Sequence, residues 1–265
     1  MAKELMTVAV CWDMDAKVSA SFAHSDRELF YFCDCCLEEV VASISKRNNF
    51  FFKALNSHEP GCAHEKEKTQ ASDVPVQLTP RPAHIAPPLI PTHLGKLAKR
   101  RKGAKPSQMQ KQALVAQVSK APAMHPGTLA EVVDAWSAMS VSKHQQVPLS
   151  IAGQQRTYFD AFAQMNASQK NIALLGCDQK VMYAQATATV LDKAILVVTW
   201  LKFETANKPV PIRVKIKPND PVAEGWTSGQ HVRLFLHGPV PTLNAQQTYY
   251  EMQPSTDYSG FIVRS

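Results

Sequence analysis

A cluster of cysteines near the start of the chain places the strongest constraint on how this sequence can fold. Four of its six cysteines lie between Phe30 and Glu65, and two histidines lie close to the last of them. The opening residues lack the long apolar run of a secretory signal, and no run is long enough to span a membrane. We therefore expect a cytoplasmic protein, in which clustered cysteines serve as metal ligands rather than as disulfides.

The spacing of these residues predicts one tetrahedral zinc site. Cys33 and Cys36 are separated by two residues, and His58 and Cys62 follow after a further 21 residues. Two donors on each of two turns can surround one Zn²⁺, and Pro60 and Gly61 would bend the second turn. Two substitutions within this set stay open, because Cys35 could replace Cys36 and His64 could replace His58. We predict that Zn²⁺ is bound by four ligands: Cys33, Cys36, His58 and Cys62.

The same cysteines and histidines indicate a structural rather than a catalytic metal. Four protein donors close the coordination sphere, whereas a catalytic zinc keeps one position for water. The sequence lacks H-E-x-x-H and the paired H-x-E and P-C-x-x-C of zinc deaminases. It also lacks the phosphate-cradling and nucleophile motifs G-x-x-x-x-G-K-[ST], G-x-G-x-x-G and G-x-S-x-G. We therefore expect that the protein is not an enzyme.

The stretches "YFCDCCLEEV" and "FFFKALNSHEPGCAH", within residues 30–65, resemble the N-terminal zinc-finger region of bacterial competence protein CoiA-like proteins. The resemblance implies a bacterial protein with a zinc finger formed by a hairpin and its flanking turns. It departs from the family at Phe50, Phe51, Phe52 and Lys53, where those proteins carry a histidine in an F-x-H stretch. The nuclease pattern of CoiA-like proteins is not found in the remainder of the sequence.

The net charge of +7 arises in the middle of the chain. Residues 1–73 carry 8 basic and 12 acidic residues, whereas residues 74–130 carry 9 basic residues and no acidic ones. A basic tract without acids attracts polyanions by releasing their counterions, and the same charge could serve only to keep a linker extended. We predict nucleic-acid contacts at six residues of this tract: Lys96, Lys99, Arg100, Arg101, Lys102 and Lys105.

Composition and periodicity divide the chain into three parts. Residues 1–66 read as about five short strands, TVAVCWD, KVSASFAHS, LFYFC, EEVVASIS and FFFKAL, forming a zinc-ribbon-like module with KRNN as a hairpin turn. A module with so small a core commonly needs a bound metal to be stable in the folded state. Residues 67–126 hold half of the 18 prolines and predict a disordered basic Pro-rich linker, with a short helix within KPSQMQKQALVAQVSK.

Residues 127–265 predict an α+β domain with two helices and an antiparallel, OB-like barrel or a sandwich. A capping box at Thr128 and Glu131 opens the first helix, and QQRTYFDAFAQM predicts the second. Strands follow in IALLGC, KVMYAQATATVL, AILVVTWLKFE, VPIRVKIK, HVRLFLHG, TYYEMQ and GFIVRS. His231 and His237 are expected at the solvent or the rim. A second basic set, which alternates with apolar residues on one strand, predicts a nucleic-acid-binding face: Arg213, Lys215 and Lys217.

The sequence as a whole predicts an α+β fold that is mostly β. It also predicts a non-enzymatic, zinc-containing accessory protein that binds nucleic acid, with DNA favoured over RNA. Single-stranded DNA is the form that an OB-like barrel would bind. The alternative is a protein–protein adaptor of a multiprotein complex, which would dock through the zinc module and the Pro-rich linker. Binding to DNA at low salt separates the two, because only the first requires it.

Overall fold

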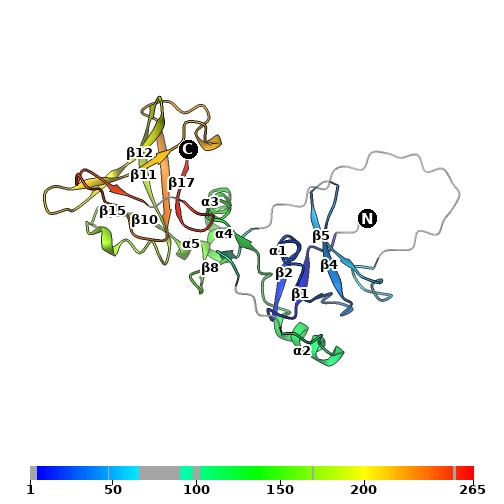
Figure 1. Cartoon of the computed structure of the whole chain (residues 1–265). Coiled ribbons are helices and arrows are strands. Elements are labelled where there is room, and N and C mark those ends of the chain that lie inside the picture. Colours follow the sequence, from blue (N-terminus) through cyan, green and yellow to red (C-terminus); the bar gives the residue numbers. More distant parts are fainter. Residues whose placement is uncertain (1–4, 47, 66–89, 98–101, 169, 253–254) are drawn as a thin grey trace. The chain divides into compact units, whose positions relative to one another are not determined.

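The computed structural model describes residues 5–46, 48–65, 90–97, 102–168, 170–252 and 255–265 and shows an α+β chain in which strands predominate (Figure 1). Its contacts divide it into two compact units. Unit 1 comprises Met1–Ile90 and Leu97–His125, and unit 2 comprises Pro91–Lys96 and Pro126–Ser265. No helix in the described parts is long and apolar enough to cross a membrane.

The described part of unit 1 holds two small sheets and two helices. Its elements are β1 (Val8–Cys11), β2 (Ala16–Ser19), α1 (Ala20–Ser25), β3 (Tyr31–Phe32), β4 (Val40–Ile44), β5 (Phe50–Ala54) and α2 (Gln108–Val118). The antiparallel strands β2, β1 and β3 form one sheet, and β4 and β5 form a separate hairpin. The turn of that hairpin contains Asn48 at φ +58°, as the KRNN stretch predicts.

One predicted strand of unit 1 is wrong in its second half. The segment KVSASFAHS forms a strand only up to Ser19 and then turns into α1. The Ser19 side chain accepts a hydrogen bond from the backbone N–H of Phe22, which is the pairing that starts a helix. A local cap therefore overrides the alternating pattern at this point.

The second half of the predicted linker belongs to unit 1 and is ordered, which corrects the predicted disorder there. The backbone N–H of Lys102 donates to the buried carboxylate of Asp13, and Met124 pairs with Lys17. Between these points the predicted helix appears as α2, opened by a capping box of Ser107 and Gln110. Four buried side chains form a small core beneath it: Val10, Phe32, Leu114 and Val118. Residues 67–89 and 98–101 of the predicted linker lie outside the described residues, and Pro91–Lys96 belongs to unit 2.

Within its described residues, unit 2 contains three helices, two 3₁₀ turns and twelve strands. The first elements are β6 (His93–Leu94), β7 (Pro126–Gly127), α3 (Leu129–Ala138), α4 (Val141–Gln146), β8 (Pro148–Ile151), β9 (Gln154–Thr157), α5 (Tyr158–Ala161) and β10 (Phe162–Gln164). The later elements are η1 (Ile172–Leu174), β11 (Val181–Leu191), β12 (Ala194–Phe203), β13 (Val210–Ile216), η2 (Pro221–Ala223), β14 (His231–His237), β15 (Thr242–Leu243), β16 (Tyr250–Glu251) and β17 (Gly260–Arg264).

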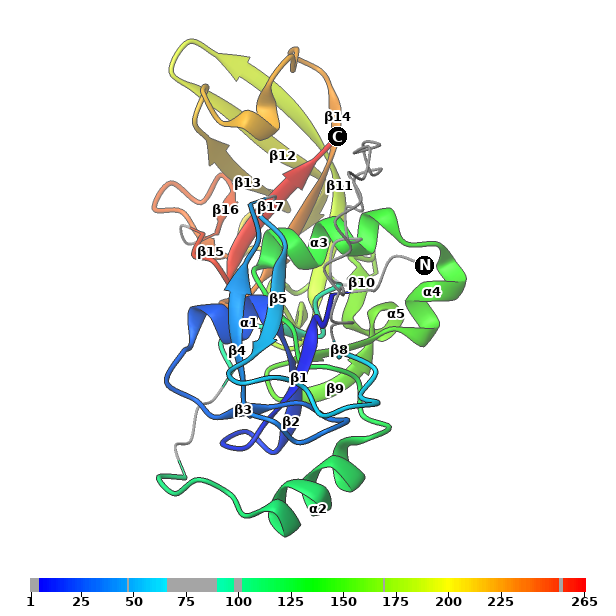
Figure 2. The same cartoon turned by 90° about the vertical axis from the view of Figure 1, so that its right-hand side faces the viewer.

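The main sheet of unit 2 runs in the order β15-β16-β13-β12-β11-β14-β17 and curls into a half-barrel, drawn from yellow to red in Figure 2. Its strands alternate between buried and exposed residues, so one face packs a core of apolar side chains such as Ala186, Val197, Val214 and Leu234. β15 and β17 lie at the two ends of this path, and the described residues contain no pairing between β13 and β17.

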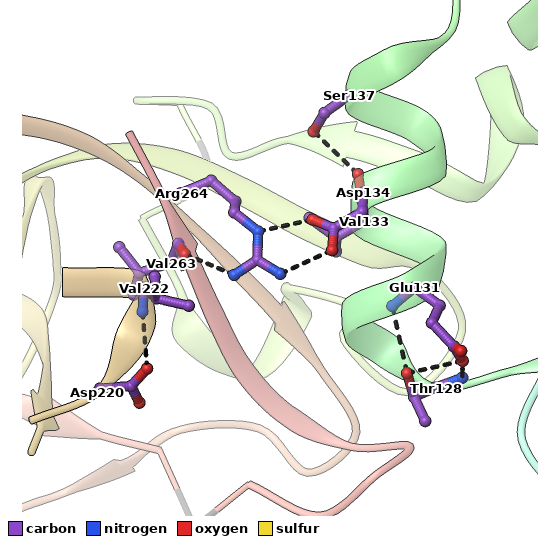
Figure 3. A network of polar contacts seen from close by, with 9 residues as sticks. All are labelled: Thr128, Glu131, Val133, Asp134, Ser137, Asp220, Val222, Val263 and Arg264. Atoms are coloured by element: carbon purple, nitrogen blue, oxygen red, sulfur yellow. Dashed lines mark hydrogen bonds and ion pairs between the residues drawn. The ribbon is translucent and has the colours of Figure 1, made fainter. Parts of the chain in front are cut away.

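The helix predicted for QQRTYFDAFAQM is wrong, as is the strand predicted for IALLGC. Residues of the former make β9, the four-residue α5 and β10, because β9 pairs with β8 through a turn at Ala152 and Gly153 and β10 pairs with β11. IALLGC forms the 3₁₀ turn η1, whose N-terminus is capped by the side chain of Asn171. The helix predicted at Thr128 is confirmed, including the reciprocal capping box with Glu131 (Figure 3).

Candidate metal centre

The first pair of predicted ligands lies on a tight turn that follows β3. The backbone N–H of Cys33 donates to Glu38, and that of Leu37 donates back to Cys33, so the chain folds around the Cys33 sulfur. The N–H of Cys35 also points at this sulfur, 3.4 Å from it. Such N–H groups stabilise a thiolate, so the turn suits Cys33 to a metal.

The second pair lies on a turn beyond β5. The N–H of Cys62 donates to the carbonyl of Glu59, and Gly61 adopts φ +85°, a conformation that glycine takes without strain. The N–H of Gly61 is held by a carboxylate oxygen of Glu65 at 2.8 Å. This tight bend turns His58 and Cys62 toward the same point, as the Pro–Gly pair in the sequence predicts.

The hairpin β4–β5 brings the two turns together. The Sγ atoms of Cys33 and Cys62 are 3.8 Å apart, and the Nδ1 atom of His58 lies 3.3 Å from the sulfur of Cys36 and 3.7 Å from that of Cys62. All four ligand atoms lie within 4.8 Å of one another. A tetrahedral zinc with Zn–S bonds of about 2.3 Å spaces its sulfurs by about 3.8 Å and a sulfur and nitrogen by about 3.6 Å. The group can therefore hold a metal ion of this size.

Burial gives these side chains the protonation behaviour expected of ligands in a metal-free site. Desolvation raises the pKa of Cys33 and of Cys62, because a buried thiolate without a positive partner is costly. Desolvation, with a smaller contribution from His64, lowers the pKa of His58 and favours the neutral imidazole that a metal requires. A bound divalent cation would supply the missing positive charge and displace the thiol protons.

The alternative ligands lie differently. Cys35 is exposed, and His64 joins a second possible group with Cys33 and Asp34 instead of the four-residue group. Among the described residues, Cys11 and His24 belong to neither group. Burial raises the pKa of Cys11 to about 12, as expected of a thiol packed in an apolar core. The structure thus brings together the set Cys33, Cys36, His58 and Cys62.

Of the six residues of the basic tract predicted to bind nucleic acid, two form ion pairs with acidic residues of unit 1. Lys102 forms an ion pair with Asp15 and lies 4.1 Å from the ring centre of Trp12, and Lys105 forms an ion pair with Glu39 at 2.9 Å. These two lysines therefore attach the segment after residue 102 to the acidic N-terminal module. Lys96 is exposed in unit 2, and the remaining three, Lys99, Arg100 and Arg101, lie outside the described residues.

The second predicted basic set lines a cleft in unit 2. Arg213 and Lys215 lie on β13 and Lys217 directly follows it, and all three border a cavity of about 620 Å³ whose other wall comes from β17. The guanidinium carbon of Arg213 lies 3.3 Å from the ring centre of Tyr249, which also lines the cavity. The cleft lies beside β13 and β17, which do not pair with each other among the described residues, and sequence pattern alone did not indicate that Tyr249 and Arg264 belong to it.

Two acidic residues, Asp220 and Glu251, also line this cleft. Glu251 lies opposite Arg213 in the parallel pairing of β13 and β16. Lys215 and Lys217 are exposed and have no ion-pair partner among the described residues. These two lysines are therefore the cations of the cleft that remain open to an external polyanion.

No protein-family model, curated protein or solved structure matches the chain, and the resemblance to CoiA-like proteins stays a prediction.

Proposed function

We propose that this chain is a non-enzymatic nucleic-acid-binding accessory protein whose N-terminal unit is held together by one Zn²⁺. The metal would be bound by Cys33, Cys36, His58 and Cys62, which together complete a tetrahedral shell and leave no position for a reacting water. In this role the zinc stabilises unit 1 by linking its two turns, and it supplies no chemistry of its own.

The cleft between β13 and β17 is the observation that supports nucleic acid as the ligand. It combines unpaired lysines with an arginine stacked on the half-buried ring of Tyr249, and proteins that bind single strands combine cations with aromatic side chains. An open channel between two strands of a curled sheet accepts an extended chain more readily than a duplex about 20 Å wide. We therefore propose single-stranded DNA as the preferred ligand of an OB-like sheet.

Fluorescence anisotropy tests this proposal. A labelled single-stranded DNA, the matching duplex and the matching RNA would each be titrated with the full, zinc-loaded chain at about 50 mM and about 200 mM salt. The proposal expects binding that weakens with salt and is strongest for the single-stranded DNA. Absence of binding to all three at the lower salt concentration would contradict it.

An observation in unit 1 favours the adaptor as a second candidate. A groove of about 490 Å³ follows β4, which pairs only with β5 among the described strands, and Val41 and Ile44 are exposed along it. An unpaired strand edge beside apolar side chains can accept a strand from a partner protein. If the DNA titrations show no binding, this groove becomes the leading interaction site.

A further inference from the structure

A second cavity of unit 2, of about 500 Å³, lies between the helices α3 and α4 and the face of the sheet that carries β14 and β17. Its size is within the range of small-molecule sites, about 300 to 1,000 Å³. It is distinct from the cleft beside β13, although Arg264 borders both. The polar and aromatic residues that matter for its chemistry are Trp136, His144, Gln185, His231, Arg233 and Arg264.

Two arginines face each other on adjacent strands at this cavity. Arg233 on β14 lies directly opposite Arg264 on β17, and like charges in this position repel each other. Arg264 is neutralised by Asp134 of α3, which accepts from its Nε at 2.7 Å and from a terminal nitrogen at 3.1 Å (Figure 3). Of the two arginines, Arg233 is therefore the one whose positive charge this carboxylate leaves without a partner.

Arg233 has no such compensation. Among the described residues it has no ion-pair partner, and its Nε atom is buried without a hydrogen-bond acceptor. Leaving a buried donor of a charged group unsatisfied costs about 1 to 3 kcal/mol or more. A cation held at this cost beside an open cavity is the feature expected of a site that binds an anion.

Aromatic rings fix the position of Arg233 without neutralising it. Its guanidinium carbon lies 5.7 Å from the ring centres of both Trp136 and Tyr183, within the range of a cation–π contact. Trp136 itself stacks with His144 and with Phe162, at interplanar angles of 4° and 11°. The arginine is thus held in place before any ligand arrives.

We propose that this cavity binds a phosphate group carried by a nucleotide or a nucleic-acid end, with Arg233 as its main ligand. Gln185 lies opposite Arg233 on β11, and His231 lies two residues before it on the same face, so three hydrogen-bonding side chains meet at the site. A planar carboxylate would be satisfied by the arginine fork alone. A phosphomonoester carries three terminal oxygens and can engage donors that do not share one plane. The volume leaves room for the group that carries the phosphate.

The source of the phosphate is distinguished by four probes added to the full, metal-loaded chain. They are inorganic phosphate, adenosine monophosphate, and one oligonucleotide with and without a 5′-phosphate. Binding of the phosphorylated oligonucleotide above the unphosphorylated one identifies a strand end, and binding of the monophosphate alone identifies a free nucleotide. Both outcomes support the proposal, whereas failure of all the phosphomonoesters to bind in the millimolar range overturns it.

Arg233→Met is the decisive variant, because methionine keeps the apolar stem and removes the charge. We expect it to weaken phosphomonoester binding about tenfold or more and to abolish the rise in melting temperature that the ligand produces. The unliganded variant should melt no lower than the wild type, since an unpaired cation has been removed. Lys193→Met, at an exposed turn, is the matched control and should bind normally. Equal binding by the Arg233→Met and Lys193→Met variants would overturn the proposal.

A measurement on the wild-type chain tests the proposal even if the Arg233→Met variant fails to fold. Phosphomonoester should shift the NMR resonance of the Arg233 Nε–H group and leave that of Arg213 unchanged, and a shift of Arg213 alone would contradict the assignment. The outcome is separable from that of the proposed function. Unphosphorylated DNA that binds through Arg213, Lys215 and Lys217 supports the cleft, and phosphate that binds through Arg233 supports this cavity, whichever of the two fails.

Discussion

The sulfur atoms of Cys33 and Cys62 are 3.8 Å apart although the two residues are separated by 29 positions in the chain. The hairpin pairing of Val40 with Ala54 closes that interval and brings the turns at its two ends together. The separation is much longer than a disulfide bond of about 2.05 Å and equals the spacing of two thiolates on one tetrahedral zinc. The two turns are therefore spaced so that one metal ion could link them.

Replacing Cys33 and Cys62 together with serine should abolish metal binding and unfold residues 5–65. The side chains of Cys33, Cys36 and Cys62 belong to the buried core of unit 1, so the loss of a metal bound by them would expose that core. Amide hydrogen exchange over β1 to β5 measures the effect, with the strands of unit 2 as an internal reference. Cys35→Ser, at an exposed position on the same turn, is the control and should keep both the metal and the protection. Protection that persists in the double variant would contradict the structural role of the metal.

Lys102→Met should destabilise unit 1 by about 1 kcal/mol, because it removes an exposed ion pair with Asp15 and a cation–π contact with Trp12. Hydrogen exchange at the N–H of Phe30, which donates to Asp13, reports on this region. A double-mutant cycle with Asp15→Asn separates the ion pair from the ring contact. Lys46→Met, exposed at the β4–β5 turn, should have no effect. If Lys102→Met leaves exchange unchanged and weakens DNA binding instead, this lysine belongs to the nucleic-acid interface.

Neutralising Arg213, Lys215 and Lys217 together with glutamine should weaken single-stranded DNA binding. Each lost phosphate contact lowers the slope of log affinity against log salt by about 0.7, so the slope should fall by up to about 2. The matched control replaces three exposed lysines of unit 2 away from the cleft: Lys143, Lys193 and Lys208. Anisotropy titrations at several salt concentrations measure both variants. A similar loss in both would mean that binding follows net charge and not the cleft.

The stability of unit 2 should fall as the pH drops below about 6.5. Burial lowers the pKa of His237, whose Nδ1–H donates to the carbonyl of Lys180, so the folded protein keeps this ring neutral where the unfolded chain binds a proton. The loss from this group is at most about 1.4 kcal/mol per pH unit. His237 is buried, which corrects its expected place at the solvent or the rim, whereas His231 is exposed as expected.

Urea unfolding followed by tryptophan fluorescence at pH 7.5 and at pH 5.5 measures this loss, since Trp136, Trp200 and Trp226 lie in unit 2. His237→Gln keeps a donor for the Lys180 carbonyl but does not titrate, so its stability should change less between the two pH values. His93, whose pKa is also lowered by burial, leaves a residual dependence. An unchanged loss in the variant would exclude His237 as its source.

Local patterns in the sequence predicted the features that depend on neighbouring residues. The capping box at Thr128, the hairpin turn at Asn48 and the alternation along β11 to β14 each involve contacts that a short window contains. The candidate ligands were found in the same way, because both turns that carry them are short and have distinctive spacing.

Features that depend on distant contacts were not predictable from such windows. The order of the segment after Lys102 depends on a hydrogen bond to Asp13, 89 residues away. In residues 154–165, Tyr158, Phe162 and Met165 are buried at helical spacing, but pairing with β8 and β11 determined the backbone. The unpaired charge of Arg233 becomes visible only once strand register places it opposite Arg264.

Elemental analysis of the freshly purified chain is the sharpest test of the proposed zinc site. We expect about one zinc per chain, released by acid or by a strong chelator with the loss of amide protection in residues 5–65 and not in unit 2. A chain that contains no metal as isolated and still shows full protection of β1 to β5 would contradict it.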